Sequence, residues 1–325
     1  MRRDRISWRW LSIGALAAVA AVAAIAWGAI VLGRGDEVAH QEGAIFGLAV
    51  SPDSLTIATC GVDRSVRFWD LESKSKIDAF YGHEAIVTAV DFDPTGAARL
   101  VSAGLDNKAV VWDIATARDL ATLQGHTDRI EGAVFDPKGE TIATASWDKT
   151  VRIWNADTGQ TLRILKGPRE GLNCVAFSPN GRLVASGGWD QRIYLWNASD
   201  GAVTKVLSGH KGGIFDVAFS KDGRWLASSA WDGTARVWDL RTFANSKTFE
   251  GIEERVVDVA FSDDSTRLAA CGDGGRLIVW NVEDGSQIES IWAHSGPAAC
   301  VLFLPNSHRI LSSGEDGVLR RWTGE

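Results

Sequence analysis

Short apolar runs alternate with polar residues along most of the chain, from about residue 40 to the C-terminus. Alternation with a period of two is typical of half-buried β-strands, and here the runs come in groups of three or four. Several runs are separated by turn sequences: Asp-Pro-Thr-Gly at 93–96, Asp-Pro-Lys-Gly at 136–139 and Ser-Pro-Asn-Gly at 178–181. Proline presets φ for a type I turn and glycine closes it. The pattern predicts an all-β protein of many short strands.

The groups of strands repeat every 42 residues. Seven tryptophans lie 43 residues apart once and then 42 apart five times, at positions 69, 112, 154, 196, 238, 280 and 322. Three more columns hold the same register in most repeats: a Ser or Thr ten residues before the Trp, an Asp six before, and a His 28 or 29 before. A fixed period of this length indicates a repeat architecture, in which each repeat buries its apolar surface against its neighbours.

These columns, with Gly-His at 82–83, 125–126 and 209–210, resemble the WD40 repeat across residues 40–322. The resemblance implies a seven-bladed β-propeller of four-stranded blades. It also implies that the His, Ser/Thr, Asp and Trp of one blade form a structural, hydrogen-bonded tetrad, since buried polar groups need partners. The complete tetrads are His83, Ser102, Asp106 and Trp112 in blade 2, His126, Thr144, Asp148 and Trp154 in blade 3, His210, Ser228, Asp232 and Trp238 in blade 5, and His294, Ser312, Asp316 and Trp322 in blade 7.

The remaining blades and the closure of the ring depart from this pattern. Blade 4 has Pro168 in place of the His, and blade 6 keeps only its Trp, while the role of His40 in blade 1 is open. The last repeat has no outer strand of its own, and the resemblance implies that residues 34–39 supply it. Glu37 stands where the other outer strands have an apolar residue, but a shift of one residue would bring Val38 into register.

A second set of tryptophans directly precedes the turn aspartate in blades 3, 4 and 5. The resemblance puts this position on the top face of the ring, beside the loops that carry the histidines. Trp, Phe and Arg together are the composition of an interaction hot spot. The expected partner-binding residues are Trp147, Trp189, Trp231, Phe215, Arg129 and Arg255. The alternative is that these tryptophans only cover the turns or pack on a neighbour.

The N-terminal segment has a different composition. Residues 1–10 are basic, and residues 11–32 carry no charge, which is long enough for a helix to cross a bilayer. The excess of arginine before this run predicts a cytoplasmic N-terminus at 1–10, a signal-anchor transmembrane helix at 11–32 and a propeller domain at 33–325 beyond it. A signal peptide cleaved after Ala24-Ile25-Ala26 is the alternative. The Ala- and Arg-rich composition is typical of bacterial proteins, so the expected location is the periplasmic side of the inner membrane.

Charge and motifs narrow the function further. After residue 35 the chain carries 29 basic against 40 acidic residues, which argues against nucleic-acid binding. The sequence contains no CxxC, HExxH, P-loop or GxSxG, so we expect no metal, no cofactor and no enzyme activity. The four cysteines are expected to be buried free thiols. Asp216 and Asp258 share one column of adjacent inner strands and are the only catalytic candidates, as paired carboxylates.

The sequence therefore predicts a membrane-anchored WD40 scaffold that binds protein partners through its top face. The alternative function is an accessory subunit of a membrane-associated enzyme or electron-transfer complex, or a propeller that binds or hydrolyses a small ligand in its central channel.

Overall fold

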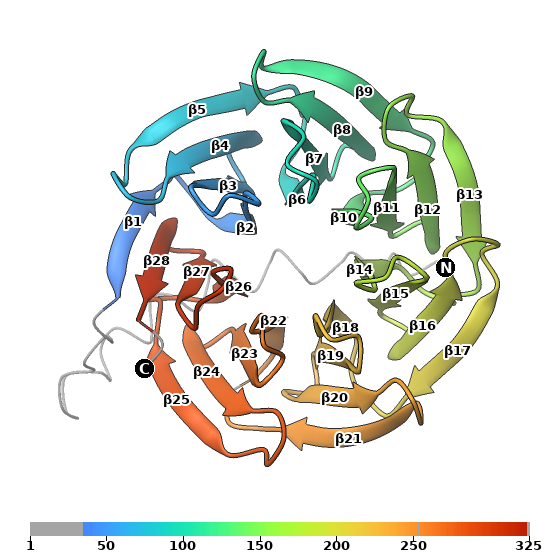
Figure 1. Ribbon diagram of the computed structural model, residues 1–325, viewed down its shortest axis with the longest axis vertical. Coiled ribbons are helices and arrows are strands. Elements are labelled where there is room, and N and C mark those ends of the chain that lie inside the picture. The colour runs from blue at the N-terminus through green and yellow to red at the C-terminus, as the bar shows by residue number, and fades with distance from the viewer. Residues whose placement is uncertain (1–34, 253, 324–325) are drawn as a thin grey trace, which may run out of the picture. The chain divides into compact units, whose positions relative to one another are not determined.

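The computed structural model describes residues 35–252 and 254–323. These residues form 28 β-strands in seven four-stranded antiparallel sheets, arranged as blades around a ring (Figure 1). The predicted all-β, seven-bladed propeller is confirmed. No helix among the described residues is long and apolar enough to cross a membrane. The predicted basic N-terminus at 1–10 and transmembrane helix at 11–32 lie outside the described residues.

Blades 1 to 6 each use four consecutive strands, which run in chain order from the ring axis outward. Blade 1 consists of β2 Ile45–Val50, β3 Thr56–Gly61, β4 Ser65–Asp70 and β5 Lys76–Tyr81, and blade 2 of β6 Val87–Phe92, β7 Arg99–Gly104, β8 Lys108–Asp113 and β9 Arg118–Gln124. Blade 3 consists of β10 Ile130–Phe135, β11 Thr141–Ser146, β12 Thr150–Asn155 and β13 Thr161–Lys166, and blade 4 of β14 Leu172–Phe177, β15 Leu183–Gly188, β16 Arg192–Asn197 and β17 Val203–Ser208. Blade 5 consists of β18 Ile214–Phe219, β19 Trp225–Ala230, β20 Ala235–Asp239 and β21 Ala244–Phe249, and blade 6 of β22 Val256–Phe261, β23 Arg267–Gly272, β24 Arg276–Asn281 and β25 Gln287–Trp292. Blade 7 combines β26 Ala298–Phe303, β27 Ile310–Gly314 and β28 Val318–Trp322 with β1 Asp36–His40.

The hydrophobic core lies between neighbouring blades. Trp154 of β12 is fully buried and packs against Val101, Ala103 and Val111 of the preceding blade. Truncating a tryptophan in such a site costs about 3–5 kcal/mol. Because the same contact recurs around the ring, both faces of each sheet are covered, which explains the apolar alternation in the sequence.

Blade 7 closes the ring through the N-terminal strand, as the resemblance implied. β1 pairs antiparallel with β28, and Ala39 lies opposite Leu319. The expected one-residue shift of Val38 into register is wrong, because the irregularity of the strand falls between Glu37 and Ala39 and leaves Val38 in the bulge. Both Val38 and Ala39 are buried, so the bulge lets two consecutive residues enter the core instead of one.

The four predicted tetrads are joined by hydrogen bonds. In blade 3 the Trp154 indole donates to Thr144 Oγ1 at 2.8 Å, and the hydroxyl lies 2.7 Å from His126 Nε2. His126 Nδ1 lies 2.7 Å from the Asp148 carboxylate. Burial favours the neutral acid, but the hydrogen bonds from His126 and Thr150 outweigh it and hold the pKa of Asp148 well below its usual range. Equivalent bonds join the tetrads of blades 2, 5 and 7.

The incomplete blades find other partners. In blade 1 Gln41, and not the exposed His40, accepts a hydrogen bond from the Thr59 hydroxyl at 2.9 Å, and Thr59 accepts the Trp69 indole. In blade 4 the missing histidine is compensated by Tyr194, whose hydroxyl donates to Asp190 at 2.9 Å.

Blade 6 replaces the polar network as a whole. Ile252 and Ala270, both buried, pack beside Trp280 in one apolar cluster. Because the His, the Ser/Thr and the Asp are all replaced, none of these three groups is left buried without a partner, and the Trp280 indole N–H alone loses its tetrad acceptor. A blade can therefore lose the tetrad and remain packed.

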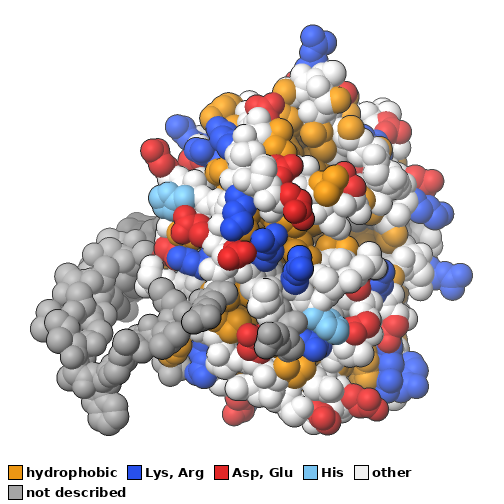
Figure 2. Space-filling view, turned by 60° about the vertical axis from the view of Figure 1, so that its left-hand side comes forward, with side chains coloured by type: hydrophobic (Ala, Val, Ile, Leu, Met, Phe, Trp, Pro, Cys, Tyr) orange, Lys and Arg blue, Asp and Glu red, His pale blue; other side chains and the backbone are white. Residues whose placement is uncertain are grey.

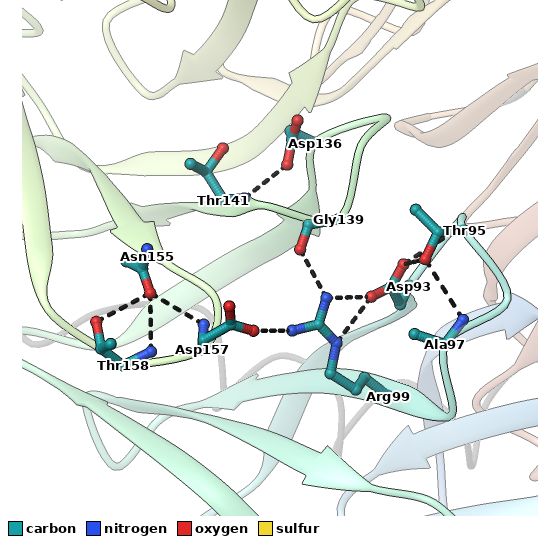
Figure 3. Close-up of polar contacts among 10 residues, drawn as sticks. All are labelled: Asp93, Thr95, Ala97, Arg99, Asp136, Gly139, Thr141, Asn155, Asp157 and Thr158. Carbon is teal, nitrogen blue, oxygen red and sulfur yellow. Dashed lines mark hydrogen bonds and ion pairs between the residues drawn. The ribbon is translucent and has the colours of Figure 1, made fainter.

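Arg99, the first residue of β7, ties blade 2 to blade 3 at the bottom face of the ring (Figure 3). Its Nη2 donates to Asp93 at 2.6 Å and to the Gly139 carbonyl at 2.8 Å, while Nη1 contacts the Asp157 carboxylate. The Asp93 side chain is fully buried, whereas Asp157 is mostly exposed. The bond to Asp93 therefore neutralises a buried charge, which an exposed ion pair does not do.

Charges of both signs are mixed on the side of the molecule that Figure 2 shows, where Lys and Arg side chains lie among Asp and Glu. That side presents no extended patch of a single sign, the feature by which a nucleic-acid-binding surface is recognised.

Candidate protein-binding site

The turn between the second and third strands displays the second set of tryptophans. In blade 3 this turn spans residues 146–149, and the Lys149 N–H donates to the Ser146 carbonyl at 3.1 Å. Lys149 has a φ of 71°, and the residue at this position has a positive φ in every blade. Trp147 and Asp148 therefore occupy the two corners of the turn, and Asp148 points back to the histidine of its blade. Asp148 therefore completes the tetrad, while the half-buried Trp147 side chain leaves the turn on another side and lies against Gly171 of the next blade.

The six expected partner-binding residues form one connected group, which we name the aromatic arc. Trp189 is its centre, with ring centroids 6.1 Å from Trp147, 5.9 Å from Phe215 and 5.7 Å from Trp231. Phe215 and Trp231 also stack, with centroids 5.9 Å apart. Distances of this size are those of favourable aromatic pairs, each worth about 0.5–1.5 kcal/mol. Blades 3, 4 and 5 are therefore linked by rings at the top face.

Glycines make this contact between blades possible. A Cβ at Gly171 would lie 3.0 Å from the Trp147 ring, and one at Gly213 would lie 2.8 Å from the Trp189 ring. Arg129, Gly171, Gly213 and Arg255 occupy one column, 42 residues apart. The two glycines in its middle leave room for a ring from the preceding blade, so each ring packs across the blade boundary.

Arginines cover both ends of the arc. The Arg129 guanidinium carbon lies 3.4 Å from the Trp147 ring centroid, and that of Arg255 lies 4.6 Å from the Trp231 ring. Each guanidinium also pairs with a carboxylate, Arg129 with Glu131 at 3.1 Å and Arg255 with Asp273. The ion pairs hold the guanidinium groups in place, and cation–π contact fixes the outer rings.

Exposure differs along the arc. Trp231 is 46% exposed, while Phe215 is buried and the other two indoles are half-buried. The Trp147 indole donates to Asn173 at 3.3 Å, and Asn173 in turn donates to the Ile214 carbonyl of the next blade at 2.7 Å. The Trp147 end of the arc thus also packs the blades together, whereas the Trp231 end presents an open aromatic surface.

Several residues that support the arc were not among the predicted partner-binding residues. Gly171, Gly213, Glu131, Asn173 and Asp273 each support a predicted residue, and all of them fall in the 42-residue columns. The column containing Arg129 and Arg255 was the available signal, because a column that reads Arg, Gly, Gly, Arg over four successive blades marks a position where side-chain size matters.

The paired carboxylates lie in contact, and their polar atoms serve the packing of the inner strands. Asp258 accepts the Val301 N–H of the next blade at 2.7 Å, and burial raises the pKa of both Asp216 and Asp258. Asp91, two residues further along the inner strand of blade 2, makes a bond of the same kind to the Phe135 N–H at 2.8 Å. These bonds tie inner strands together, so the geometry does not favour catalysis by the pair.

The cysteines match the prediction in part. Cys60, Cys174 and Cys271 are buried free thiols, but Cys300 is only partly buried, and its thiol donates to the Phe46 carbonyl at 3.0 Å. Among residues 35–252 and 254–323, no cluster of three His, Cys, Asp or Glu side chains could hold a metal ion.

Comparison with known proteins identifies the repeat. The family model described as WD domain, G-beta repeat matches residues 36–70, 74–113, 117–155, 159–197, 201–239, 244–281 and 285–323. Each match covers the outer strand of one blade and the first three strands of the next. The first match therefore begins with β1, which is the outer strand of blade 7.

Two curated proteins share short similar segments. A U3 snoRNP-associated protein-like YAOH of Oryza sativa subsp. japonica is 38% identical over 50 residues, covering 15% of this chain and 10% of that protein. An uncharacterized WD repeat-containing protein of Schizosaccharomyces pombe is 33% identical over 52 residues, covering 16% of this chain and 10% of that protein. The chain thus spans about a tenth of the length of these relatives.

Proposed function

The chain belongs to the WD40-repeat family, and on that premise we propose that it is a protein-interaction scaffold whose contact surface is the aromatic arc. The observation that carries this proposal is the exposed end of the arc, where Trp231 contacts both the Phe215 ring and the Arg255 guanidinium, which also contact each other. An indole held by several neighbouring side chains loses little conformational entropy on binding, and Trp and Arg dominate the energetics of protein interfaces.

The test of this proposal replaces Trp231 with a photo-crosslinking amino acid in the native host. Tyr81 provides a matched control, because it is 69% exposed but lies on the outer strand of blade 1, away from the arc. We expect a defined crosslinked protein from position 231 and none, or a different set, from position 81. Trp231→Ala should lose that partner but stay folded, with a melting temperature lowered by only a few degrees, because its ring contacts with Trp189 and Phe215 are lost. The same crosslinks from both positions would argue against a specific site.

We also propose that residues 11–32 anchor the protein in the inner membrane of a bacterium, with the propeller on the periplasmic side. The support is the uncharged run of 22 residues and the arginines that precede it. Alkaline carbonate extraction and a C-terminal compartment reporter test this. Retention in the membrane with a periplasmic reporter is the expected result. A shortened, extractable product would instead indicate a cleaved signal peptide, and a cytoplasmic reporter would contradict the topology.

A further inference from the structure

A pocket of about 400 Å³ opens on the outer half of blade 3, next to the turn that carries Trp147. Its polar lining comes from three parts of that blade: the loop before β10, the turn after β11, and the facing strands β12 and β13. The residues with polar side chains are Thr127, Asp148, Lys149, Thr150, Arg152 and Lys166. Three of them are cations and one is a carboxylate, so the pocket carries a net positive charge.

Arg152 differs from the other arginines of its column. Arg67 of blade 1 donates to Asp63 at 2.7 Å, Arg320 of blade 7 donates to Asp316 at 2.9 Å, and the Nε of Arg236 in blade 5 donates to the Thr234 hydroxyl at 3.5 Å. Arg152 Nε is buried, yet it has no hydrogen-bond partner among the described residues. A buried charged donor without an acceptor is costly, and native structures usually satisfy it with a protein group, water or a ligand.

The neighbouring aspartate does not serve as the acceptor for Arg152 Nε. Asp148 already accepts hydrogen bonds from His126, from the Thr150 hydroxyl and amide, and from the Thr127 amide. The tetrad thus binds the one carboxylate of the pocket and leaves the arginine for another anion. The guanidinium lies in the space that the absent side chain of Gly125 leaves, since a Cβ there would come within 2.5 Å of Nη1, and its carbon lies 5.7 Å from the Trp154 ring centroid.

Lys166 and Lys149 add two cations that the other blades lack in this combination. Lys166 lies opposite Thr150 on the neighbouring strand. The residues of its column are His40, Tyr81, Gln124, Lys166, Ser208, Glu250 and Trp292, so it is the only Lys or Arg among them. Lys149 is half exposed, donates to the Arg169 carbonyl at 2.8 Å and lies 3.8 Å from Glu170. Exposed contacts of this kind exchange readily, so Lys149 is available to a ligand.

We propose that this pocket binds a tetrahedral oxyanion of the phosphate class. A planar guanidinium presents two parallel donors to such an anion, and two lysines supply compact charge. The hydroxyls of Thr127 and Thr150 provide neutral donors at the wall. The phosphate reaches the pocket as free inorganic phosphate or as a phosphate monoester on another molecule. The proposal stands on the blade 3 residues alone and is independent of the aromatic arc.

The experiment follows the ³¹P linewidth of inorganic phosphate and of O-phosphoserine as the purified full-length chain is added. Acetate and chloride at matched ionic strength serve as competitors. We expect binding with a dissociation constant on the order of 1 mM, as for a partly exposed site of few charges. Lys166→Glu, which copies the residue of blade 5, and Arg152→Gln should each weaken it at least tenfold. Lys76→Glu, an exposed lysine on the outer strand of blade 1, should leave it unchanged.

The outcomes separate the sources of the anion. Tighter binding of phosphoserine than of phosphate identifies a phosphate monoester as the ligand, and binding of phosphate alone identifies the free ion. Competition by acetate as strong as that by phosphate, or equal affinity in the Lys166→Glu and Lys76→Glu variants, would overturn the proposal. Lys166→Glu is a surface change, so it keeps the test decisive if Arg152→Gln does not fold.

Discussion

Substituting Gly213 with alanine should displace the Trp189 ring and so break the centre of the aromatic arc. Gly213 has an ordinary backbone conformation, so alanine adds no strain of its own. Its Cβ, however, would lie 2.8 Å from Trp189 Cε3, which is about 0.6 Å closer than the shortest ordinary contact of 3.4 Å. The indole has to move, because the Cβ is fixed to the backbone.

The expected magnitude follows from the contacts of Trp189 with three other rings, at 5.7–6.1 Å between centroids. Each aromatic pair contributes about 0.5–1.5 kcal/mol, and a shift of the ring weakens these pairs without removing them. We expect the free energy of unfolding to fall by about 1–2 kcal/mol. Near-ultraviolet circular dichroism should change as well, since it reports the mutual orientation of the indoles.

Urea unfolding and near-ultraviolet circular dichroism measure the two effects, with Gly296→Ala as the control. Gly296 lies in the corresponding loop of blade 7, also has an ordinary backbone conformation, and a Cβ there meets nothing within 4 Å. That variant should be neutral or slightly stabilised, by less than about 1 kcal/mol, because alanine restricts the unfolded chain. If Gly213→Ala behaves like Gly296→Ala in both measurements, the glycine gap does not hold the arc together.

Three further predictions concern buried polar groups. Arg99→Met should lower the free energy of unfolding in urea by about 3–5 kcal/mol, because it leaves the buried Asp93 carboxylate without its charge partner. Asp157→Ala, which removes the exposed partner of the same arginine, should cost at most about 1 kcal/mol. Equal costs for the two variants would refute the distinction between the buried and the exposed ion pair. Burial raises the pKa of Asp91 to about 7, so the native state holds a proton that the unfolded chain releases near pH 4, and stability should decline as the pH rises from about 4 to 7. Asp91→Asn should flatten that decline and add up to about 4 kcal/mol at pH 8, and an unchanged pH profile in urea titrations would show that another group is responsible. Thr144→Val should cost about 2–4 kcal/mol in thermal or urea unfolding, since it leaves a buried histidine and an indole N–H without their shared hydroxyl, and a near-neutral result would mean that water replaces it.

The blade count and the tetrads could be predicted from the sequence. Columns 42 residues apart place the same side chain at the same point of every sheet, and the tetrad lies within one blade and its preceding loop. The blades that deviate were also visible, but their solutions were not. Tyr194 compensates for Pro168 from another strand, and Gln41 replaces His40 because the bulge in β1 changes the register of the following residue.

The sequence alone determined which residues recur at the same point of each blade, because strand and turn periodicity is a local property of the chain, and the resemblance to the WD40 repeat implied which of them lie at the top of the ring. Only the tertiary structure decided which of these side chains touch. The aromatic arc depends on rings that cross blade boundaries over Gly171 and Gly213, and a one-blade pattern carries no record of its neighbour. The lack of a hydrogen-bond acceptor for Arg152 Nε among the described residues was likewise not readable from one repeat. Asp148, the carboxylate of the same pocket, already accepts hydrogen bonds from His126, Thr127 and Thr150. These donors come from different strands and loops, so only the folded chain brings them to Asp148.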